Sequence, residues 1–210
     1  MRTSIIVVTL SAFAGGASAP TGEDVTGKFF NGKDISAWEC DKKEMWSVEN
    51  GEIVGKSPNI EENVFLLNPM KMGDFRLIVD VKVTDNATNS GIQFRSRWDE
   101  PSQHVIGYQA DIGEGWWGKI FDEGGERGLL TETDGDKLIK PNEWNTYEIL
   151  AVGHKIQMAL NGKLCSDLDD PKGATEGIIA LQLHGGYVME ARFRNFSVEL
   201  NPEFKLKTVK

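Results

Sequence analysis

Apolar and polar residues alternate with a period of two along much of the chain. The clearest run is DFRLIVDVKV at 74–83, where apolar side chains at odd positions alternate with charged ones at most even positions. This period predicts a β-strand with one buried face. Residues 46–49 and 52–54 show further strand-like runs, separated by Asn50-Gly51, the dipeptide most typical of a two-residue hairpin turn.

The same signals continue to the end of the chain. Residues 147–152 and 155–160 are joined by Gly153-His154, and Asn161-Gly162 follows as another turn. The last run, 189–200, changes phase near Arg194-Asn195, which indicates a β-bulge. About a dozen short strands without repeats or helical periodicity favour an all-β fold, a single antiparallel two-sheet sandwich.

The two ends of the chain differ from this pattern. Residues 1–19 combine a basic Arg2, a short apolar stretch and Ala17-Ser18-Ala19, as in a secretory signal peptide with its cleavage site. We therefore expect an exported protein, periplasmic or extracellular, with one domain over 25–202. The basic tail 203–210 is expected to be frayed.

The net charge limits the classes of ligand expected for this chain, and the cysteine count limits its possible disulfides. The formal net charge of −9 disfavours nucleic acid and anionic membranes and suits a neutral ligand. An exported chain with Cys40 and Cys165 could form one disulfide. Two cysteines are not a disulfide framework, so two separate buried thiols are the preferred interpretation. We expect a monomer.

Three predicted strands, at 89–97, 107–113 and 181–186, share an unusual polar face. Alternation places their apolar side chains in the core and their amides, arginine, carboxylate and imidazole on the other face. If the strands lie in one sheet, these groups form a surface suited to hydrogen bonding a polyhydroxyl ligand. Its members are Gln93, Arg95, Gln109, Asp111, Gln182 and His184.

Each of these residues also has a purely structural interpretation. Arg95 could pair with Asp111, Gln93 and Gln182 could be ordinary surface residues, and His184 could be a structural histidine. His104 and His154 lie in turn-like contexts and are interpreted as surface residues.

A long predicted loop, 112–145, adds aromatic and charged candidates. Trp116 or Trp117 could stack on a sugar ring or pack in the core, and Lys119 is a further substrate-binding candidate. Asp122 and Glu123 belong to the same segment, and Asp134 and Asp136 are interpreted as solvated.

Ten segments, in order along the chain, resemble the 3-keto-disaccharide hydrolase family. They include FFNGKDISAWE, WSVENGEIVG, NSGIQFRS, GYQADIG, WNTYEILAVG and LQLHGG, and the resemblance covers about Gly27 to Leu200. It implies a concanavalin-like jelly roll of the lectin and glucanase type, with a concave ligand-binding face. It also implies action on an oxidised (3-keto) di- or oligosaccharide or glycoside. Many members have Glu-x-Gln where this chain has Gln109-Ala110-Asp111.

This pattern disfavours an ordinary glucanase and suits a different chemistry. Glucanases of this fold carry Glu-x-Asp-x-Glu, but Gln109 and Gly113 flank Asp111 here, and retaining hydrolysis needs two carboxyls. A ketone at carbon 3 acidifies the proton at carbon 2, so one base and donors to the enolate oxygen suffice for elimination. We expect His184 or Asp111 to be the base, with Arg95 and Gln109 stabilising the oxygen.

Three alternatives remain open. A divalent metal on Asp111 and His184 could polarise the ketone, although no tight ligand spacing is present and no cofactor is required. A non-catalytic carbohydrate-binding module would present a similar face. A lectin-like adhesion or scaffold domain is less favoured because the chain has one domain without repeats.

Overall fold

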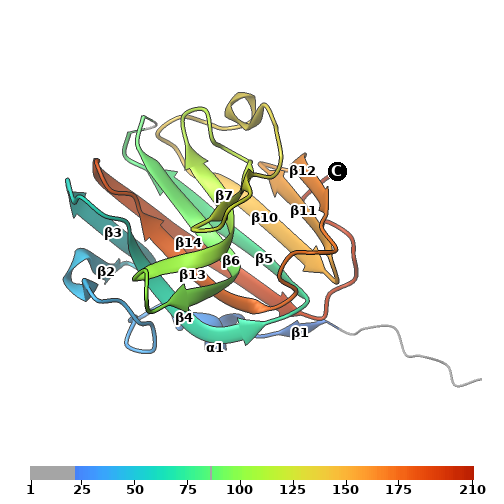
Figure 1. Cartoon of the computed structure of the whole chain (residues 1–210), viewed down its shortest axis with the longest axis horizontal. Helices are drawn as coiled ribbons and strands as arrows, with labels where there is room; N and C mark the ends of the chain where they lie inside the picture. The colour runs from blue at the N-terminus through green and yellow to red at the C-terminus, as the bar shows by residue number, and fades with distance from the viewer. Residues whose placement is uncertain (1–21, 86) are drawn as a thin grey trace, which may run out of the picture.

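The computed structural model describes residues 22–85 and 87–210, which form two antiparallel β-sheets packed face to face (Figure 1). The predicted signal peptide, 1–19, lies outside the described residues. In the described part of the chain, no helix is both long and apolar enough to cross a membrane. The prediction of an all-β sandwich is confirmed.

The larger sheet has eight strands in the order β12-β11-β10-β5-β14-β3-β2, with β1 paired to β14. Its strands are β1 (Glu23–Asp24), β2 (Trp46–Glu49), β3 (Glu52–Pro58), β5 (Phe75–Val83), β10 (Asn145–Val152), β11 (Lys155–Leu160), β12 (Lys163–Asp169) and β14 (Val188–Leu200). Asn50 and Gly51 both have positive φ, as the predicted Asn-Gly turn requires. The register of β14 on β5 shifts between Arg194 and Ser197, which confirms the predicted bulge.

The smaller sheet has six strands in the order β4-β13-β6-β7-β8-β9. Its strands are β4 (Val64–Met72), β6 (Asn89–Asp99), β7 (His104–Gly113), β8 (Ile120–Glu123), β9 (Gly128–Leu129) and β13 (Gly177–Leu183). The three strands with the polar face, β6, β7 and β13, are therefore in one sheet, with β6 in the middle.

The hydrophobic core lies between the two sheets. The alternating residues of β5 enter it from the larger sheet, and Ile92, Phe94, Tyr108, Ala110, Ile112, Leu181 and Leu183 enter it from the smaller one. Alternation thus orients β6, β7 and β13 as predicted, and the opposite face of the smaller sheet, its outer face, receives the polar side chains.

Helical structure is limited to short segments in the described residues. They are α1 (Thr26–Phe29), η1 (Lys43–Met45) and η2 (Gly135–Lys137). The segment 112–145 is more ordered than a long loop, because β8, β9 and η2 lie within it and β8 extends the smaller sheet.

The expectation of a frayed C-terminal tail is wrong. Glu148, with a fully buried side chain, accepts hydrogen bonds from the backbone N–H groups of Lys207 and Thr208, at 2.8 Å each. Arg76 pairs with Glu148 (Nε–Oε1 3.1 Å) and donates to the carbonyl oxygen of Glu203 at 2.9 Å. Buried charges need such partners, and the tail supplies them.

A bulge in the β6–β7 hairpin determines what covers the outer face. The pairing shifts between Phe94 and Arg97, and Arg95 there has a φ of +48°. Beyond the bulge, Trp98 and Val105 pack with Phe65 and Leu67 of β4 in a second apolar cluster, separate from the main core. The end of the hairpin therefore bends over the outer face of the smaller sheet.

Candidate active site

The polar side chains predicted for the outer face come together in adjacent rows. Gln93 lies directly opposite Gln109, while Gly91 lies between Asp111 on one side and Gln182 on the other. Directly opposed residues present their side chains on the same face. A Cβ on Gly91 would be 2.3 Å from Gln109 Cδ, so glycine there makes room for the amide.

These side chains form a directed chain of hydrogen bonds that ends on Asp111. Ser96 Oγ lies 3.1 Å from Gln93 Oε1, Gln93 Nε2 donates to Gln109 Oε1 at 2.6 Å, and Gln109 Nε2 donates to Asp111 Oδ1 at 2.6 Å. The second carboxylate oxygen, Asp111 Oδ2, is buried and has no hydrogen-bond partner, and the same holds for Gln182 Oε1. Buried acceptors of this kind are rare and are expected to receive a donor from water or a ligand.

The chain of amides is covered rather than open to solvent. Gln93 and Gln182 are 0% exposed, and Asp111 is 3% exposed. The sequence predicted a surface for ligand binding, and this part of the prediction is wrong because these side chains are buried.

Burial has a direct effect on Asp111. The pKa of this carboxyl is raised from 3.8 to about 7, chiefly by the loss of hydration and to a lesser degree by the negative charge of Glu123. The hydrogen bond from Gln109 and the positive charge of Lys119 act in the opposite direction. Asp111 therefore exchanges a proton near neutral pH, as an efficient acid or base must.

Glu123 is a central residue of the site, and its sequence context predicted only a loop residue. It lies on β8 opposite Gly107, and its side chain is 13% exposed. Its Oε1 accepts from Asn63 Nδ2 at 3.2 Å and from Gln182 Nε2 at 3.4 Å. Burial raises the pKa of Glu123, while the charges of His104 and His184 and the bond from Asn63 lower it. Residues 120–123 read IFDE, two apolar residues followed by two acids, so no alternation in the sequence marked this strand.

Two histidines flank Glu123. His104 Nε2 is 3.4 Å from Glu123 Oε1, so the interpretation of His104 as a surface residue is wrong. His104 Nδ1 lies 2.8 Å from the carbonyl oxygen of Val105, and His184 Nδ1 lies 2.7 Å from that of Gly185. A carbonyl only accepts, so each Nδ1 carries the proton and, in the neutral ring, each Nε2 is the basic nitrogen.

Arg95 does not belong to this group, contrary to the prediction. Because it sits in the bulge with positive φ, its side chain leaves the outer face and reaches the turns at one end of the sandwich. It donates to the carbonyl oxygens of Gly73 at 3.1 Å and Gly153 at 2.6 Å, and pairs with Asp74 at 3.3 Å. Arg95 is thus a structural residue, and it cannot hold an enolate oxygen beside Asp111.

The two tryptophans have different environments. Trp117 is 1% exposed and stacks on Tyr147 with ring centroids 6.1 Å apart, so it packs in the core and is no sugar platform. Trp116 is 37% exposed, and Lys119 Nζ lies 5.4 Å from its ring centroid. Trp116 is therefore the tryptophan that a ligand could reach, while Lys119, with a side chain 17% exposed, pairs with Glu132 at 3.1 Å.

Across residues 22–85 and 87–210, no three His, Cys, Asp or Glu side chains come together as a metal site. Cys40 and Cys165 are separate thiols, as preferred from the sequence.

Residues 26–199 match the sequence profile of the 3-keto-alpha-glucoside-1,2-lyase-like domain. The chain belongs to this family. Comparison with curated proteins gave no match.

Solved structures show the same fold at low sequence identity. A candidate glycosyl hydrolase from Parabacteroides distasonis aligns with a TM-score of 0.63 and 19% identity, over 83% of this chain and 93% of its own. The carbohydrate-binding module CBM66 from Bacillus subtilis aligns with a TM-score of 0.58 and 20% identity, over 78% and 95%. The endo-beta-1,3(4)-glucanase SCLam aligns with a TM-score of 0.52 and 12% identity, over 90% and 87%. These similarities establish the jelly-roll fold.

Proposed function

We propose that this protein is an exported enzyme that cleaves 3-keto-glycosides by removing the proton at carbon 2. The observation that carries the proposal is the group formed by His184, Glu123 and Asp111 on the outer face of the smaller sheet. Two of its members, Asp111 and Glu123, have a pKa raised by burial, and perturbed carboxyls beside an imidazole are typical of catalytic sites. Membership of the 3-keto-alpha-glucoside-1,2-lyase-like family supports the proposed substrate class.

His184 is the proposed base. Its Nδ1–H is held by the carbonyl of Gly185, which leaves Nε2 to accept a proton. The nearby charge of Glu123 stabilises the imidazolium that forms. The electron pair of the C2–H bond forms a C2=C3 double bond, and the ketone oxygen becomes a negatively charged enolate oxygen. Lys119, in place of Arg95, is the proposed positive partner of this oxygen.

Collapse of the enolate restores the ketone, forms a C1=C2 double bond and breaks the bond from carbon 1 to the leaving oxygen. Asp111, partly protonated at neutral pH, is the proposed donor of the proton that this oxygen takes up. Because Asp111 is only 3% exposed, the transfer requires a bridging water or a shift of the covering hairpin. Addition of water across C1=C2 completes hydrolysis.

A non-catalytic carbohydrate-binding module is the second candidate. It is favoured by the low exposure of Asp111 and by the structural similarity to CBM66. Turnover separates the two: incubation with a 3-keto-glycoside should release the aglycone from an enzyme, whereas a binding module returns the ligand unchanged. Loss of turnover in His184→Ala with an unchanged fold supports the assignment of the base.

A further inference from the structure

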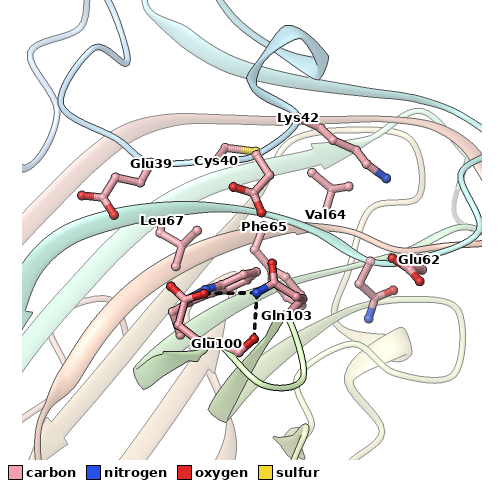
Figure 2. Close-up of a pocket in the computed structure, with 12 residues that line it drawn as sticks. Glu39, Cys40, Lys42, Glu62, Val64, Phe65, Leu67, Glu100 and Gln103 are labelled. Carbon is pink, nitrogen blue, oxygen red and sulfur yellow. Dashed lines mark hydrogen bonds between the residues drawn. The ribbon is translucent and has the colours of Figure 1, made fainter.

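A cavity of about 360 Å³ lies beside the candidate site, between the loop that follows α1, the start of β4 and the end of the β6–β7 hairpin. Figure 2 shows Glu39, Cys40 and Lys42 on one side and the turn with Glu100 and Gln103 on the other. Its volume is in the range of small-molecule sites. None of the roles proposed above uses it.

Two residues that line the cavity also contact residues of the candidate site. Asn63 lines the cavity and also donates from Nδ2 to Glu123 Oε1 at 3.2 Å. Phe65 lines it too, and its ring contacts the ring of His104 with centroids 5.0 Å apart. A sugar bound at Glu123 and His184 would therefore have the cavity as its neighbour.

The lining combines a flat apolar floor with a rim that accepts hydrogen bonds. Trp98, Phe65 and Leu67 supply the apolar surface. Gln103 uses its amide hydrogens on Glu100, at 2.7 Å to the carbonyl and 3.1 Å to the carboxylate, so its Oε1 is left as an acceptor. The rim carboxylates are those of Glu39, Asp41, Glu62 and Glu100, opposed by Lys42.

We propose that this cavity is the leaving-group subsite and that it selects an aglycone made of fused flat rings with hydroxyl groups at the edge. The inference rests on the proposed function. Aromatic rings gain from stacking on Trp98 and Phe65, and edge hydroxyls donate to the acceptors of the rim. The excess of carboxylates rejects an aglycone that is itself an anion.

Binding of the free aglycone tests the cavity without any chemistry. The probe is a naphthol that bears a hydroxymethyl group on its second ring, measured by titration calorimetry against the full-length protein. Trp98→Ala removes the floor, and Cys40→Phe fills the space from the opposite side. Trp144→Ala is the matched control, since Trp144 directly precedes β10 of the larger sheet and its ring centroid lies 3.8 Å from Arg194 Cζ.

We expect both cavity variants to bind the naphthol about tenfold more weakly or worse, which corresponds to about 1.4 kcal/mol, and Trp144→Ala to bind it as the wild type does. The naphthoate analogue should not bind. No binding of the naphthol to the wild-type protein, or equal binding by Cys40→Phe, overturns the cavity as a site. Cys40→Phe decides this even if Trp98→Ala fails to fold.

Turnover then tests the leaving-group assignment. The substrates are 3-keto-glucosides of the same naphthylmethyl alcohol and of methanol, both of which release an alkoxide. We expect kcat/KM to favour the naphthylmethyl substrate about tenfold or more in wild type and Trp144→Ala, and the preference to vanish in the cavity variants. Equal kcat/KM values for the two substrates in wild type overturn the assignment. If the wild-type protein cleaves neither substrate, the proposed function is contradicted. The binding of the free naphthol still decides whether the cavity is a binding site.

Discussion

Gln109 donates a hydrogen bond from Nε2 to Asp111 Oδ1 at 2.6 Å, and it is itself held by Gln93. The two residues are neighbours on one face of β7, and their bond is the last of a buried chain of amides. It fixes the orientation of the carboxyl group that titrates near neutral pH, and it lowers the pKa of that group against the larger effect of burial.

Replacing Gln109 by Ala is expected to raise the pKa of Asp111 above its wild-type value of about 7. The charged carboxylate loses its donor, while burial and the charge of Glu123 still favour the protonated form. Titration of the Asp111 carboxyl by ¹³C NMR measures this directly. An unchanged or lower pKa in Gln109→Ala would show that the hydrogen bond has no such role.

Asp111→Asn is expected to become more stable relative to wild type as the pH rises from about 4 to about 7. The pKa of Asp111 in the folded state, about 7, lies above the ordinary value of 3.8. In this window the unfolded wild-type chain releases the proton that the folded protein retains, so wild-type stability falls with rising pH. The relative gain is at most about 4 kcal/mol. Chemical denaturation across the window measures it, and parallel curves for the two proteins would contradict the assignment.

His184→Ala and Glu123→Gln are expected to lower kcat on a 3-keto-glycoside. The loss of a positioned base typically costs about 10²–10⁴-fold, and removal of the charge that stabilises the imidazolium should cost less. His154→Ala is the matched control, because His154 is exposed and pairs with the exposed Asp169. A wild-type kcat in His184→Ala would show that His184 is not the base.

Arg95→Ala is expected to destabilise the fold by about 3 kcal/mol, because it leaves the carbonyls of Gly73 and Gly153 without their buried donor. KM and kcat of the protein that remains folded should not change. Arg97→Ala, at an exposed pair with Asp99, should cost less than about 1 kcal/mol. Thermal unfolding and steady-state kinetics on both variants test this, and a selective loss of kcat in Arg95→Ala would return the residue to the site.

Removal of residues 206–210 is expected to destabilise the protein by about 3 kcal/mol, because buried Glu148 loses the donors from Lys207 and Thr208. Replacing Lys210 alone by Ala should have no comparable effect. Equal melting temperatures for the truncated and full-length proteins would show that the tail contributes nothing.

The sequence predicted the parts of the fold that depend on local patterns. Alternation along β5, β6 and β7 identified the buried faces, and Asn50-Gly51 identified a turn. The same alternation put Gln93, Gln109, Asp111 and Gln182 on one face, as found. The direction of each side chain within a strand and the identity of each turn depend only on residues that are close in the sequence.

The predictions that failed concern features that are set by contacts between residues far apart in the sequence. Arg95 obeys the alternation in the sequence, but a bulge rotates it out of the face, and no pattern in NSGIQFRSR marks that bulge. The bending of the hairpin over the sheet depends on contacts of Trp98 with β4, which lie far apart in the sequence. Glu123 and His104 meet only because β8 pairs with β7. This pairing also brings a second carboxyl, that of Glu123, near Asp111, although Gln109 and Gly113 on the same strand carry none.

The most direct test of the central claim compares one glycoside in its 3-keto and unoxidised forms, with products identified by mass. We predict that the wild-type protein releases the aglycone from the keto form and leaves the parent unchanged, since His184 can remove only a proton that the ketone has acidified. Release from the unoxidised parent at a comparable rate would contradict this account and would assign Asp111 and Glu123 to ordinary glycoside hydrolysis.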